Sequence, residues 1–90
     1  GNIILDPSDG TGTGIDGNVG INEASPSYKL DVNGNIRAQG QFVLPSYAVA
    51  SLPTGTTGGL IYVSDETGGA VPAFYDGSNW RRVTDRAVVS

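Results

Sequence analysis

Residues 71–83 read Val71-Pro72-Ala73-Phe74-Tyr75-Asp76-Gly77-Ser78-Asn79-Trp80-Arg81-Arg82-Val83, and this stretch decides the fold. Two runs rich in aromatic and β-branched side chains flank four turn-forming residues, which is typical of two strands joined by a tight turn. A third run of the same kind, Leu60 to Ser64, precedes them. Because short connections join antiparallel neighbours, residues 60–83 are predicted to form a β-meander.

The turn at residues 76–79 sets which side chains share a face of that sheet. Gly77 or Asn79 is expected to adopt a positive φ there. Successive strand residues point to opposite faces, so Trp80 and Arg81 are predicted to diverge, with Trp80 in the core or in an interface. Pro72 cannot donate a ladder hydrogen bond, so its strand is expected to lie at an edge or its nitrogen to face away from a partner.

The N-terminal part of the chain contains a loose repeat of the pattern Gly-Asn-apolar-x-apolar. Its copies are Gly1 to Leu5, Gly17 to Ile21 and Gly34 to Ala38, and their starts lie 16 and 17 residues apart. A fixed period predicts one structural unit used several times, here a short strand and a turn. One unit has too few apolar side chains for a core, so the units are expected to stack and several chains to share an axis. Chance recurrence of a common turn pair is the alternative.

A hairpin is predicted inside the third copy of this repeat. Apolar and polar residues alternate through residues 28–32 and again through residues 35–38, and Asn33-Gly34 lies between the two runs. Asn-Gly between alternating runs is the strongest short hairpin signal. We therefore expect residues 1–42 to form a repetitive β stalk and residues 43–90 to form a small β-meander head module.

The composition narrows the ways in which so small a chain is stabilised. The chain has 90 residues, no Cys and no His, so neither a disulfide nor the commonest metal ligand supports its core. Chains of this size often need such a support or oligomerisation, so oligomerisation is expected. The net charge is −4 with five basic residues, which disfavours nucleic acid and anionic membranes as partners.

Two stretches resemble a known class of proteins. Residues 19–22 with residues 25–38 resemble a segment recurrent in phage tail fibres and tailspikes, and residues 59–66 with residues 74–83 resemble the closing module of phage and cyanophage structural proteins. The resemblance implies an all-β homotrimeric fibre, with a β-spiral or β-prism-like stalk before the meander. It also implies other virion or tail proteins as partners and a place on the virion. The chain opens in mid-pattern at Gly1 and is expected to be a piece of a longer polypeptide.

Two functions follow from this interpretation. The first is a structural segment of a trimeric virion or tail fibre, which provides trimerisation and an extended rigid shaft or knob. The alternative is a receptor-binding fibre tip that recognises a host-surface glycan. In that case Tyr75 and Trp80 would stack on sugar rings, and Arg81 and Arg82 would bind hydroxyl or acidic groups.

No catalytic, metal or cofactor site is expected, and the chain is predicted not to be an enzyme. Asp65-Glu66, or Asp76 with Asp85, would pair as in glycoside hydrolysis, but they border turns and a small meander lacks a long saccharide groove. The aspartates among residues 6–16 do not follow the ligand spacing of an EF-hand calcium loop. Residues 10–14 are rich in Gly but are not followed by the Lys of a phosphate-binding loop.

Overall fold

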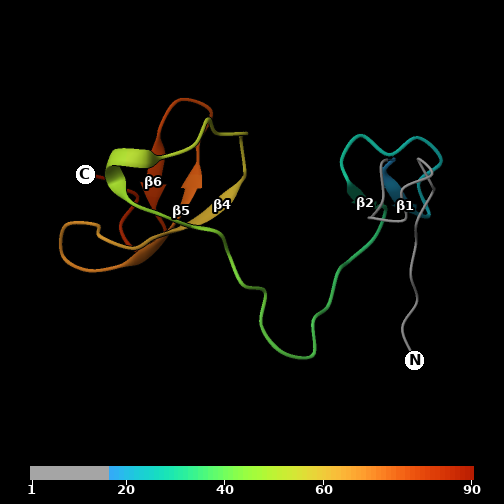
Figure 1. Ribbon diagram of the computed structural model, residues 1–90, viewed down its shortest axis with the longest axis horizontal. Coiled ribbons are helices and arrows are strands. Elements are labelled where there is room, and N and C mark those ends of the chain that lie inside the picture. The colour runs from blue at the N-terminus through green and yellow to red at the C-terminus, as the bar shows by residue number, and fades with distance from the viewer. Residues whose placement is uncertain (1–16) are drawn as a thin grey trace, which may run out of the picture. The chain divides into compact units, whose positions relative to one another are not determined.

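The computed structural model describes residues 17–90, which form short strands, turns and one turn of 3-10 helix (Figure 1). The chain divides into two compact units between Gly40 and Gln41, and each unit is described here by itself. The first copy of the Gly-Asn repeat and the aspartates among residues 6–16 lie outside the described residues. Two sheets account for all the strands of residues 17–90, which confirms the predicted all-β class.

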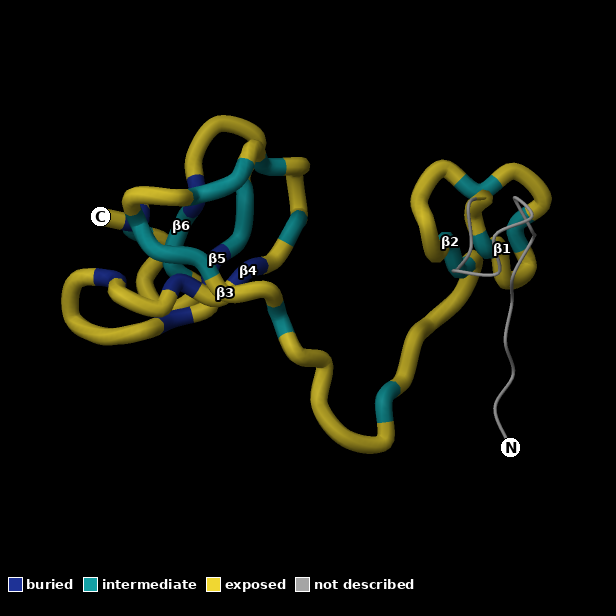
Figure 2. Tube along the Cα trace, in the orientation of Figure 1, coloured by how far each residue is buried: buried dark blue, intermediate teal, exposed yellow. Residues whose placement is uncertain are grey.

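The first unit contains a two-stranded parallel sheet. Strand β1 (Val19–Ile21) pairs with β2 (Leu30–Val32), so that Val19 lies beside Leu30 and Ile21 beside Val32. Residues directly paired in a sheet point to the same side, so these four apolar side chains share one face. None of residues 17–40 is buried (Figure 2). The described part of the first unit therefore has no core of its own.

The predicted hairpin around Asn33-Gly34 is wrong. Strand β2 pairs with β1 instead, the Asn33 N–H donates to the Ile21 carbonyl at 3.0 Å, and residues 35–38 form no strand. The register explains the failure, because a two-residue turn would pair Val32 with Asn35. Apolar residues of one strand would then lie on the same face as polar residues of the other. Neither face of the sheet would be consistently apolar, which is unfavourable for burial. Parallel pairing with β1 places apolar residues beside apolar residues.

The second unit contains a four-stranded sheet in the order β3-β4-β5-β6. Strands β4 (Leu60–Val63), β5 (Val71–Tyr75) and β6 (Trp80–Arg82) are antiparallel neighbours and confirm the predicted meander (Figure 1). Strand β3 (Ser46–Tyr47) was not predicted and adds a parallel edge to β4. A 3-10 turn, η1 (Val49–Ser51), follows it.

The core of the second unit lies on one face of this sheet. Burial alternates along β4 and β5, as the two-residue period of a strand requires (Figure 2). An isolated antiparallel bridge between Arg81 and Val88 brings the C-terminal segment alongside β6. The buried apolar side chains are Ile61, Val63, Val71, Ala73, Trp80 and Val89. We call this side of the sheet the core face and the opposite side the outer face.

The turn between β5 and β6 has the predicted conformation. Gly77 has a φ of 104°, and the Asp76 carboxylate accepts hydrogen bonds from the N–H groups of Ser78 and Asn79 at 2.8 and 2.7 Å. The turn places Tyr75 opposite Trp80. Trp80 is 8% exposed, which confirms its predicted burial, and its indole N–H donates to the Pro53 carbonyl at 3.0 Å.

Pro72 is tolerated inside the sheet because its nitrogen faces away from β4, toward Val83 just beyond the end of β6. The Tyr62 N–H donates away from Pro72, to the Pro45 carbonyl at 2.9 Å, so the Tyr62–Pro72 pair exchanges no hydrogen bond. The polar main-chain atoms of Pro72 face the β6 side, where the Val83 N–H donates to its carbonyl at 3.0 Å. Strand β6 ends at Arg82, one residue before Val83, so Pro72 faces a position beyond the end of that strand.

Replacement of the only tryptophan tests this core. The Trp80→Ala change leaves a cavity and is expected to lower the free energy of unfolding by about 3–5 kcal/mol. Trp80→Phe keeps most of the volume and loses the bond to Pro53, so a loss of about 1 kcal/mol is expected. Urea unfolding measures both values. Water-like, readily quenched emission from the folded wild-type protein would contradict the burial of Trp80.

Candidate functional site

The four residues predicted for glycan binding do not meet on one surface. Tyr75 and Trp80 are partners on the core face, and their ring centroids lie 5.1 Å apart at an angle of 64°. Arg81 points to the outer face. Arg82 lies at the edge of the core face, where its guanidinium binds the Asp85 carboxylate at 3.0 Å. Glycan recognition by these residues stays a prediction.

The outer face of the second unit is apolar and open to solvent. Leu60, Phe74, Arg81 and Val88 lie side by side across the sheet in one row. Tyr62 and Pro72 pair in the next row, and Val83 follows through its hydrogen bond to Pro72. On β3, Ser46 pairs with Tyr62 and continues that row. The outer face therefore consists of Ser46, Leu60, Tyr62, Pro72, Phe74, Arg81, Val83 and Val88. Leu60 and Val83 are 51% and 50% exposed, which is high for large apolar side chains on a sheet.

One ion pair neutralises the charge on this face. The Arg81 Nε–H donates to Asp76 Oδ2, and the Arg81 Nη1–H donates to the Arg86 carbonyl at 2.9 Å. The hydrogen bond from Arg81, followed by those from the N–H groups of Asn79 and Ser78, lowers the pKa of Asp76 from 3.8 to about 2. The Asp76 carboxylate therefore joins the turn to the outer face and remains ionised over most of the pH range.

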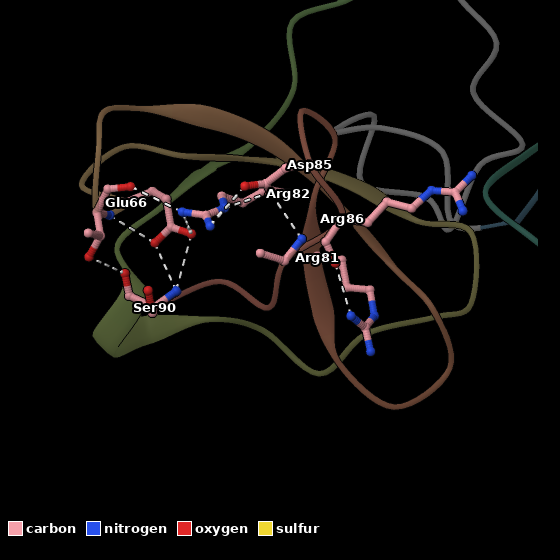
Figure 3. Close-up of polar contacts among 8 residues, drawn as sticks. Glu66, Arg81, Arg82, Asp85, Arg86 and Ser90 are labelled. Atoms are coloured by element: carbon pink, nitrogen blue, oxygen red, sulfur yellow. Dashed lines mark hydrogen bonds and ion pairs between the residues drawn. The ribbon is translucent and has the colours of Figure 1, made fainter.

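A buried carboxylate holds the C-terminal segment to the second unit. The side chain of Glu66 accepts hydrogen bonds from the N–H groups of Ser90 at 2.8 Å and Thr67 at 3.0 Å. The Arg82 guanidinium lies 3.7 Å from it and also binds Asp85, so that Arg82 bridges the two carboxylates (Figure 3). The Thr67 N–H and hydroxyl donate in return to the Ser90 carbonyl. We call this network the C-terminal clasp.

The sequence gives little sign of the clasp. A Glu beside a turn is usually solvated, whereas the side chain of Glu66 is fully buried. Its partners come from the loop that follows it and from a residue 24 positions later in the chain. An acidic residue followed at a distance by a basic one is too common a pattern to identify such a contact. The burial of Glu66 therefore depends on contacts between segments that are distant in the sequence, and local sequence patterns do not reveal it.

The carboxylates considered for hydrolysis have structural partners. Asp65 accepts a hydrogen bond from the Val49 N–H at 2.8 Å, at the start of η1. Asp85 accepts one from the Ala87 N–H at 3.0 Å, and this bond is the largest cause of the lowered pKa of Asp85. Among residues 17–90 no three carboxylates lie close enough together to bind a metal ion. These hydrogen bonds indicate that the carboxylates of Asp65 and Asp85 stabilise turns.

Two shallow hollows border the sheet. One of about 570 Å³ is lined by Phe74, Asp76, Arg81, Val83 and Arg86 on the outer face. The guanidinium groups of Arg81 and Arg86 diverge, so this hollow does not offer two convergent cations (Figure 3). A second, of about 520 Å³, lies between residues 41–44 and Tyr62. Both hollows extend the outer face; the first has three charged side chains in its lining, whereas the lining of the second is mostly apolar and suits contact with another apolar surface.

The Asp76–Arg81 pair predicts a defined dependence of stability on pH. The pKa of Asp76 is lower in the folded protein, so the pair stabilises folding above about pH 4, and this contribution is lost as the pH falls through about 2. Asp76→Asn keeps an oxygen for the turn N–H groups but cannot ionise. We expect urea midpoints of this variant to fall less steeply than those of the wild type between roughly pH 4 and pH 2. Parallel curves would contradict this role for Asp76.

The clasp predicts that Glu66 stabilises the second unit. Glu66→Ala leaves the Ser90 N–H without its acceptor and the Thr67 N–H with the Ser90 carbonyl alone, and the free energy of unfolding is expected to fall by about 1–3 kcal/mol. Glu66→Gln retains one acceptor oxygen and should lose less. Amide hydrogen exchange at Thr67 and Ser90 reports the same contact. Unchanged protection of both amides in Glu66→Ala would show that the clasp does not form in solution.

No helix in residues 17–90 has the length and apolar character needed to cross a membrane. Comparison with protein-family models, with curated proteins and with solved structures finds no match to this chain.

Proposed function

We propose that this chain is a structural segment of a homotrimeric virion or tail fibre, which provides trimerisation and a rigid shaft or knob. The observation that carries this proposal is the small amount of apolar surface that one chain buries. Six apolar side chains form the core of the second unit, and residues 17–40 bury none. Domains with so little core and no disulfide commonly gain their stability from association.

The first unit supports the same proposal. Its strands β1 and β2 align four apolar side chains on one face, and Ile21 and Leu30 are each 55% exposed. A two-stranded sheet is at best marginally stable alone in water and needs a further surface to cover its apolar face. Equivalent faces of other copies would provide that surface along a fibre.

The assignment to a fibre rests on the resemblance of residues 19–22 with 25–38, and of residues 59–66 with 74–83, to segments of phage fibres and related structural proteins. Other virion or tail proteins are accordingly proposed as partners, and the assembled particle as the location. The all-β architecture and the exposed apolar faces agree with this proposal. The absence of Cys is also compatible, because association stabilises such a fibre without disulfides.

The molar mass in solution tests the proposal directly. Light scattering coupled to size-exclusion chromatography is expected to give three times the chain mass of 9.2 kDa at micromolar concentration. Dilution should lower the melting temperature, because dissociation is favoured at low concentration. A folded species with the mass of a single chain, and a melting temperature independent of concentration, would refute the proposed trimer.

A further inference from the structure

The outer face of the second unit combines exposed apolar side chains with a continuous arrangement of them. Leu60 and Val83 are about half exposed, and Tyr62 and Val88 are 38% and 45% exposed. These side chains lie in two adjacent rows of one sheet, so they form a continuous patch. Contiguous exposed apolar patches commonly mark interaction sites.

We propose that this outer face is the surface by which copies of the chain associate, and that its occupant is a second copy of the same chain. The inference rests on the proposed homotrimer and assigns its contact surface. In this proposal both faces of the sheet in the second unit are covered, the core face by the chain itself and the outer face by a neighbouring copy.

Charge favours a second copy as the occupant. Residues 41–90 carry four acidic and three basic side chains, so the charge of the second unit does not oppose contact between two copies. On the outer face Asp76 neutralises Arg81, and Arg86, which lines the hollow beside them, directs its guanidinium away from Arg81 (Figure 3). A neutral apolar face can meet its own equivalent without burying an unpaired charge.

The size of the face indicates which part of the interface it forms. Standard interfaces contain about 20–30 residues per partner, with an apolar centre and a polar rim. The outer face has eight residues, six of them apolar or aromatic, which fits such a centre. The hollow between residues 41–44 and Tyr62 continues it, and Phe42 and Val43 there are 63% and 86% exposed. The rim residues of the second unit would surround this centre.

Substitutions on the face test the proposal by mass. Leu60→Asp and Val83→Asp replace half-exposed side chains, so the fold of the second unit should persist while the trimer dissociates to single chains. Ile36→Asp is the control, because Ile36 has a similar exposure of 57% but lies in the first unit and outside any strand. Light scattering gives the mass, and the emission of the buried Trp80 reports folding.

A labelling experiment covers the case in which an aspartate variant unfolds. The chain has no Cys, so Val83→Cys and the exposed turn variant Ser78→Cys each offer maleimide one thiol. In the trimer, labelling of Val83→Cys is expected to be at least tenfold slower than that of Ser78→Cys, and it should recover on dilution to single chains.

A trimeric wild type with equal labelling rates would overturn the assigned surface but leave the trimer intact. A trimeric Leu60→Asp would do the same, as would dissociation of Ile36→Asp alone. A monomeric wild type would overturn the proposed function itself.

Discussion

The register between β5 and β6 is the constraint on which the second unit depends, and the Asp76 carboxylate holds it. One oxygen of Asp76 accepts hydrogen bonds from the two N–H groups of the turn, and the other accepts one from the Arg81 Nε–H. This turn places Tyr75 opposite Trp80, which turns the indole into the core and leaves Arg81 on the outer face. A shift by one residue would exchange the two faces, exposing the indole and burying a guanidinium.

The same alternation explains how much of the fold sequence reasoning predicts. The meander, the positive φ of Gly77 and the burial of Trp80 follow from local signals: turn residues between runs with a two-residue period. The hairpin at Asn33-Gly34 had an equally strong local signal, but it would have paired Val32 with a polar residue. In the β5–β6 hairpin the pair next to the turn, Tyr75 and Trp80, is aromatic on both strands, and this pair distinguishes the two cases.

The features that could not be predicted depend on residues far apart in the sequence. Strand β3 is two residues long. It forms because the Tyr62 and Ser64 N–H groups donate hydrogen bonds to the carbonyls of Pro45 and Tyr47. Burial of Glu66 requires Ser90 to return to the loop that follows β4. The divergence of Arg81 from Trp80, by contrast, follows from the two-residue period of a strand and was predicted; it separates the residues of the glycan-binding alternative.

In the proposed assembly, the two faces of the sheet would divide the stabilisation of the second unit between one chain and its neighbours. On the core face, the clasp brings the C-terminal segment back so that Val89 is buried, and this contact is complete within one chain. On the outer face, Val88 of the same segment points outward beside Arg81. Adjacent residues of the C-terminal segment therefore serve both faces. Loosening the clasp would displace Val88 together with Val89, so an assembly through the outer face would depend on a carboxylate, Glu66, that lies on the core side of the same sheet.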